Sequence, residues 1–217
     1  MQMDDSMSSI SLSEDHTAAA KPEAKVIQPA WVRVVHWINA VAIVLMIMSG
    51  WQIYNASPLF NFTFSSSITL GGWLGGGIMW HLAAMWLLVI NGLFYLTLGI
   101  VTGRFRRKLL PISAKGVLDD TKAALTGQLS HADLSNYNQV QKQLYTGIIV
   151  VGILIVLSGL AIWKPVQLQY LTALFGGYDT ARYVHFFMMA AIVGFLVIHV
   201  ALALIVPKSL RAMIIGR

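Results

Sequence analysis

The sequence contains no cysteine among its 217 residues. Without thiols the chain can form no disulfide, hold no iron–sulfur cluster on thiolates and attach no haem through a C-x-x-C-H sequence. Any metal or redox chemistry that the chain carries must therefore use other side chains.

Charged residues are also scarce. They make up 11% of the chain, against 57% hydrophobic residues, whereas soluble domains have roughly 25% charged residues. No Asp or Glu occurs between Glu23 and Asp119. This composition indicates a protein whose surface mostly faces a lipid bilayer.

The N-terminal segment, residues 1–30, is polar and rich in Ser and Ala. It lacks the basic segment and apolar core of a secretory signal peptide, so we expect a disordered tail. Residues 31–217 are expected to form one membrane domain.

Four apolar stretches follow the tail, and each is about 20 residues long, enough to cross a ~30 Å hydrocarbon core as a helix. The fold class expected is an all-α, four-helix transmembrane bundle. The helices are expected at about 31–53, 78–101, 144–163 and 184–206, with a long loop at 102–143 that includes a short surface helix.

The basic residues are segregated by loop. Of the 15 Lys and Arg residues, only Lys164 and Arg182 fall on the side of the bundle that carries the first and third loops. The positive-inside rule then places both termini and the 102–143 loop in the cytoplasm, as in a multi-pass protein of the bacterial inner membrane. The pI of about 9.7 thus reflects topology, and no nucleic-acid partner is expected.

Four of the six histidines lie inside the apolar stretches, where ionisable side chains are costly and usually functional. His36 and His199 are expected near the cytoplasmic face, and His81 and His185 near the outer face. His16 and His131 lie in polar segments and are expected to be solvated. The topology therefore predicts two histidine pairs, one at each level of the membrane.

His185 and His199 share one helix. Their spacing of 14 residues leaves both within about 40° of one helix face and about 21 Å apart along the axis. Two flat cofactors stacked across the membrane, each held by two imidazoles, require this arrangement, and we assign two haem b groups to His36/His199 and His81/His185. Interhelical hydrogen bonding, a proton relay and a zinc or copper site remain alternatives.

Small and polar residues near these levels could support such cofactors. Gly50 and Gly159 would allow close approach of a porphyrin or a neighbouring helix. Candidates for binding the haem propionates are Arg33, Lys142 and Lys208 at the inner level and Arg182 and Trp73 at the outer level.

The outer loops carry little charge, and residues 54–77 carry none. Such a surface suits the docking of a protein partner. Alternatively, these loops fold back onto the helix ends as interfacial segments.

The stretches WVRVVHWINAVAIVLMIMSGW, WHLAAMWLLVINGLFY and YNQVQKQLYTG, with His185-x13-His199, resemble the prokaryotic cytochrome b561 or b-type cytochrome subunit family. Its members include membrane subunits of nickel–iron hydrogenases, formate dehydrogenases and thiosulfate reductases. The resemblance covers about residues 29–217 and looks strongest to cytochromes that pair with a periplasmic sulfite-oxidase-like molybdopterin enzyme. It implies that the four histidines are haem ligands.

The resemblance further implies electron transfer between a periplasmic redox enzyme and membrane quinone. Tyr137, Asn138 and Gln141 are the candidate quinone site, although Asn138 and Gln141 could merely cap a helix. One alternative is a stand-alone cytochrome b561 that passes electrons from superoxide to quinone, and another is a transporter or assembly factor without haem. The sequence leaves oligomerisation open.

Overall fold

The computed structural model describes residues 27–126 and 137–216. Most of the expected tail lies outside the described residues, as do His16 and His131. Over the described ranges the chain is helical and has no strand, so the expected all-α class is confirmed.

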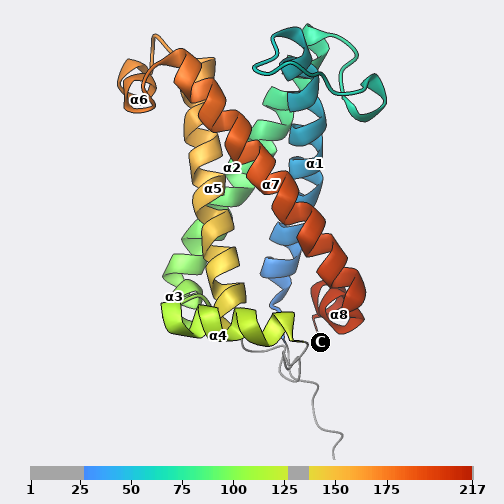
Figure 1. Ribbon diagram of the computed structural model, residues 1–217, viewed down its shortest axis with the longest axis vertical. Helices are drawn as coiled ribbons and strands as arrows, with labels where there is room; N and C mark the ends of the chain where they lie inside the picture. The colour runs from blue at the N-terminus through green and yellow to red at the C-terminus, as the bar shows by residue number, and fades with distance from the viewer. Residues whose placement is uncertain (1–26, 127–136, 217) are drawn as a thin grey trace, which may run out of the picture.

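Four long helices form the bundle, and each is long and apolar enough to cross a membrane. They are α1 (Ala30–Ala56), α2 (Leu74–Val101), α5 (Gln139–Trp163) and α7 (Tyr178–Ile205). Helix α1 packs mainly against α2, and α5 packs mainly against α7. Figure 1 shows α7 crossing the bundle obliquely, from the side of α5 at one end to the side of α1 at the other.

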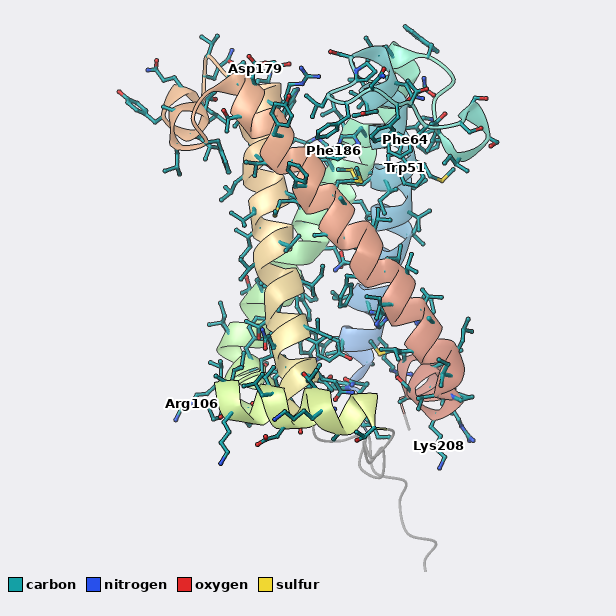
Figure 2. All side chains as sticks on the ribbon, in the orientation of Figure 1. Trp51, Phe64, Arg106, Asp179, Phe186 and Lys208 are labelled. Carbon is teal, nitrogen blue, oxygen red and sulfur yellow. The ribbon has the colours of Figure 1, made fainter. Side chains whose placement is uncertain are left out.

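The two ends of the bundle differ in their short elements (Figure 1). One end, here called the terminal end, carries α3 (Arg104–Lys108), α4 (Ala114–Leu125) and α8 (Pro207–Ile215) together with the C-terminus. The opposite end, here called the loop end, carries η1 (Ser66–Ile68) and α6 (Gln169–Leu174). Figure 2 shows Arg106 and Lys208 at the terminal end, where most of the described basic residues lie.

Local sequence explains where α5 begins and where α7 ends. Asn138 accepts a hydrogen bond from the Gln141 amide at 2.8 Å, and the Gln141 side chain accepts one from the Asn138 amide at 3.1 Å. This capping box satisfies the first orphan donors of α5. Pro207 lacks an amide hydrogen, so α7 ends at Ile205 and α8 begins with the proline.

The α1–α2 loop folds back over the loop end. The Asn55 side chain makes two hydrogen bonds to the Phe64 backbone: it donates to the carbonyl and accepts from the amide, both at 2.8 Å. The Phe64 ring stacks on Trp51 with centroids 4.6 Å apart, and Figure 2 places Phe186 of α7 close by. The uncharged loop is therefore an ordered aromatic layer that joins α1 to α7.

A buried amide ties α1 to α2 at membrane depth. Asn91 donates to the Val35 carbonyl and to the Asn39 side chain, both at 2.8 Å. Such interhelical bonds contribute about 1 kcal/mol in membrane proteins.

We expect Asn91→Leu to lower the free energy of unfolding by about that amount, measured by SDS titration in micelles. A loss no larger than that of Ile90→Leu, a neighbouring exposed position, would contradict this role.

Candidate functional site

The loop end of the bundle holds one pair of facing imidazoles. His81 of α2 and His185 of α7 have ring centroids 6.3 Å apart and ring planes inclined by 67°. Helix α2 packs mainly against α1, and α7 packs mainly against α5, so the two histidines come from different halves of the bundle. This loop-end pair thus joins the two halves of the bundle.

On the adjacent helix, a serine followed directly by a glycine, here called a Ser-Gly step, lies against each of these rings. Ser49 Oγ of α1 lies 3.0 Å from His81 Nδ1, and Ser158 Oγ of α5 lies 3.2 Å from His185 Nδ1. The Ile155 carbonyl lies 3.0 Å from the same His185 nitrogen. A carbonyl only accepts hydrogen bonds, so His185 Nδ1 carries the proton and Nε2 is left with its lone pair. Metal-binding histidines are oriented in this way.

The two glycines of these steps lie directly behind the rings. A Cβ atom at Gly50 would stand 3.3 Å from His81 Cε1, and one at Gly159 would stand 3.1 Å from His185 Cε1. Ser49 and Ser158 are fully buried. The sequence thus keeps both sites small so that the imidazoles can lie against helix backbone.

A second pair of imidazoles lies toward the terminal end. His36 of α1 and His199 of α7 have ring centroids 6.0 Å apart and planes inclined by 61°. Phe195 stacks on His199 at 5.5 Å, and Trp37 meets His36 edge-on at 5.4 Å. Aromatic rings thus help to hold both imidazoles of this terminal-end pair in place.

The centroid distances of both histidine pairs fit two imidazoles that bind one metal ion from opposite sides. An imidazole nitrogen binds a metal at about 2 Å, so imidazoles on opposite sides of one ion have centroids about 6 Å apart. Among the described residues, no group of three or more His, Cys, Asp or Glu side chains could hold a metal ion. The geometry therefore suits two axial ligands per metal and does not suit the three or four protein ligands of a zinc site.

The terminal-end pair borders a large cavity of about 1010 Å³, at the upper limit of the ~300–1,000 Å³ usual for ligand pockets. Apolar side chains of α1, α2, α5 and α7 form most of its wall. The polar residues of its lining include Gln28, Tyr95, Arg104, Lys108, Tyr137, Asn138, Gln141 and Tyr145.

Comparison with known proteins decides the family. Residues 27–216 match the family model described as prokaryotic cytochrome b561. The chain belongs to the prokaryotic cytochrome b561 family. Haem is implied by this family, and the four apolar helices of this b561-type cytochrome make it a multi-pass protein of the bacterial inner membrane.

One relative from Azospira oryzae (strain ATCC BAA-33 / DSM 13638 / PS) is 52% identical over 194 residues. The match covers 89% of this cytochrome and 98% of the relative. The relative is named "Putative protein-methionine-sulfoxide reductase subunit YedZ1".

Haem b fits the residues present in this cytochrome. It is held by axial side chains without a thioether bond, as a chain with no cysteine requires. The two histidine pairs have the spacing for two axial imidazoles, and glycines rather than bulky residues back the loop-end rings.

The candidates for propionate binding lie in different surroundings. Arg33 donates to the Ile214 carbonyl at 2.8 Å, so its guanidinium faces α8. Arg182 donates to the Ser57 carbonyl at 2.6 Å and to Ser57 Oγ at 3.1 Å, which ties α7 to the α1–α2 loop. Trp73 precedes α2 and is 67% exposed. The two arginines are thus hydrogen-bonded to groups of a helix end or a loop, and Trp73 lies at the surface.

The candidate quinone residues come together in the cavity lining, because Tyr137, Asn138 and Gln141 all border it. The side-chain oxygens of Asn138 and Gln141 are engaged in the capping box of α5. Helix capping, which the sequence left open as an alternative, is therefore present. Tyr137 is the member whose ring is not part of the cap.

The sequence reasoning missed other polar residues of this lining. Arg104 Nη2 donates to Gln28 Oε1 at 2.6 Å, and Gln28 Nε2 donates to the Tyr137 hydroxyl at 3.2 Å. The Arg104 guanidinium also lies 6.0 Å from the centre of the Trp31 ring. These residues come from different segments, so only their packing reveals the network.

Proposed function

We propose that this b561-type membrane subunit holds two haem b groups, one on His36 and His199 and the other on His81 and His185. The observation that carries this proposal is the pair of centroid distances, 6.0 and 6.3 Å, on two levels of one bundle. Two imidazoles would hold each haem, and each haem would then supply a one-electron couple without an open iron site for oxygen chemistry.

We further propose that the terminal end lies in the cytoplasm and the loop end in the periplasm. Helices α3, α4 and α8 bring most of the described Lys and Arg side chains to the terminal end, whereas Lys164 and Arg182 lie at the loop end. The positive-inside rule supports this orientation.

The partner proposed is a periplasmic reductase that docks on the loop end. The relative from Azospira oryzae is named as a subunit of a protein-methionine-sulfoxide reductase, and the ordered, uncharged α1–α2 loop offers an apolar docking surface. A reductase consumes electrons, so electrons would run from the cytoplasmic level to the periplasmic level. The overall reaction would convert quinol and a sulfoxide into quinone, a thioether and water.

The chain's own residues would organise this transfer. The four imidazoles would fix two haems at constant separation, and Ser49 and Ser158 would orient the loop-end rings. A quinone would bind in the terminal-end cavity, near Tyr137, Asn138 and Gln141.

The stand-alone superoxide pathway has less support. A cationic outer surface would be needed to attract the anion. Among the described residues, the loop end carries only the cations Lys164 and Arg182, against the anion Asp179.

The test of the proposed cofactors is the haem content of detergent-purified protein. We expect two haem b per chain by pyridine haemochrome and a dithionite-reduced spectrum with two components. A folded chain that contains no haem, from cells supplied with haem, would contradict the proposal. Copurification of a tagged chain with a periplasmic subunit would test the proposed partner separately.

A further inference from the structure

The two halves of the bundle repeat one another. Helix α1 begins at Ala30 and α5 at Gln139, 109 positions later, and the same offset relates Ser49-Gly50 to Ser158-Gly159. Helices α2 and α7 are both 28 residues long and start 104 positions apart, at Leu74 and Tyr178. This second offset carries His81 onto His185.

The repeat relates the two members of the loop-end pair to each other, because each half contributes one histidine that lies against one Ser-Gly step. The terminal-end pair behaves differently. The offsets carry His36 of α1 onto Tyr145 of α5, and they carry Tyr95 of α2 onto His199 of α7. The counterpart of the His36/His199 pair is therefore a pair of tyrosines, Tyr95 and Tyr145.

The tyrosine pair borders the same cavity as the terminal-end histidines. Tyr145 meets the Tyr137 ring edge-on at 5.0 Å, and Tyr95 lies 6.3 Å from Trp31. Within residues 27–126 and 137–216, no hydrogen-bond partner is found for the hydroxyl of Tyr95 or Tyr145. Both tyrosines are half-buried and border the cavity, so their hydroxyls can hydrogen-bond the polar atoms of a ligand in this part of it.

We propose that Tyr95 and Tyr145 bind the headgroup of a quinone in the cavity that His36 and His199 also border. A quinone ring has two carbonyls on opposite edges, and two hydroxyls contributed by different helices can donate one hydrogen bond to each. A phenol also accepts a hydrogen bond, so the same two residues can bind the quinol. This inference rests on the proposed function and assigns the headgroup contacts that it needs.

The surroundings suit both the ring and its tail. Leu93 of α2 and Ile153 of α5 line the cavity and are exposed, so an isoprenoid chain would meet an apolar wall between these helices. Quinol oxidation releases two electrons and two protons. The electrons pass to the sulfoxide substrate of the proposed partner. The protons leave to water at the terminal end, where Gln28 and Tyr137 are hydrogen-bonded to each other.

The test compares Tyr95→Phe, Tyr145→Phe and the double variant with Tyr170→Phe, a residue of α6 at the loop end that is 85% exposed. Haem content and the dithionite-reduced spectrum are recorded first, because the Phe variants should retain both haems. Reduction of the haems by decylubiquinol and by menadiol is then followed by stopped flow over a range of quinol concentrations.

Each single variant should raise the quinol concentration for half-maximal rate about fivefold, as expected for the loss of one hydrogen bond, and Tyr170→Phe should leave it unchanged. Wild-type affinity in the double variant with both haems intact would overturn the tyrosine site while leaving the proposed electron path standing. Loss of a haem in the Phe variants would also overturn it, because the tyrosines would then support the cofactor instead. A two-haem wild type that neither quinol reduces would refute the quinone step of the proposed function itself.

Discussion

Replacing His185 with leucine should remove one haem and leave the other, halving the haem content per chain. The remaining haem should be the one proposed on His36 and His199, because His199 lies 14 residues from His185 along α7 and pairs with His36 of α1. Substitution of His199 should remove the complementary spectral component. Pyridine haemochrome together with low-temperature difference spectra of the two variants would measure both effects.

The pairing itself is tested by the partner histidines. His81→Leu should lose the same spectral component as His185→Leu, and His36→Leu should lose the same component as His199→Leu. His131→Ala serves as the control and should retain both haems. Loss of the same component from His81 and His199 variants would contradict the pairing.

A larger side chain at Gly159 should have nearly the same effect as loss of the histidine. Already a Cβ atom would stand 3.1 Å from His185 Cε1, and the rest of a leucine side chain would extend into the space of the imidazole. We expect Gly159→Leu to lose the loop-end haem and Gly159→Ala to retain it with a shifted axial geometry. Electron paramagnetic resonance of the oxidised low-spin haems would report the shift.

The matched control is Gly147→Leu on the same helix. A Cβ at Gly147 meets nothing within 4 Å, so this variant should keep both haems and wild-type resonance signals. If Gly147→Leu and Gly159→Leu lost haem equally, the effect would come from α5 as a whole. Retention of two unaltered haems in Gly159→Leu would refute the close approach between Gly159 and His185.

Hydropathy predicted the number of spanning helices but not their full length. Helix α5 starts at Gln139, where 144 was expected, because Gln139, Gln141 and Lys142 are polar yet belong to the helix. The capping box of Asn138 and Gln141 fixes that start, and capping depends on local hydrogen bonds that an apolar count does not detect. In the same way, α7 begins at Tyr178, six residues before the expected position.

The repeat between the two halves was accessible in the sequence and was missed. The matching signals are the Ser-Gly steps and the spacing of 14 residues that separates His185 from His199 and also His81 from Tyr95. Because the counterpart of a histidine is here a tyrosine, a search for repeated histidines alone does not detect the relation.

The sequence by itself determined that this chain crosses a membrane four times and carries histidines at two depths, because length, hydropathy and charge are properties of single segments. The depths of the histidines already predicted the two pairs, but only the tertiary structure shows how the imidazoles meet, because the oblique path of α7 sets His185 against α2 and His199 against α1. The tertiary structure also directed Arg33 to α8 and brought Tyr95, Tyr145 and the terminal-end histidines around one cavity. Such contacts between distant segments depend on how the helices pack, and hydropathy and charge do not specify that packing.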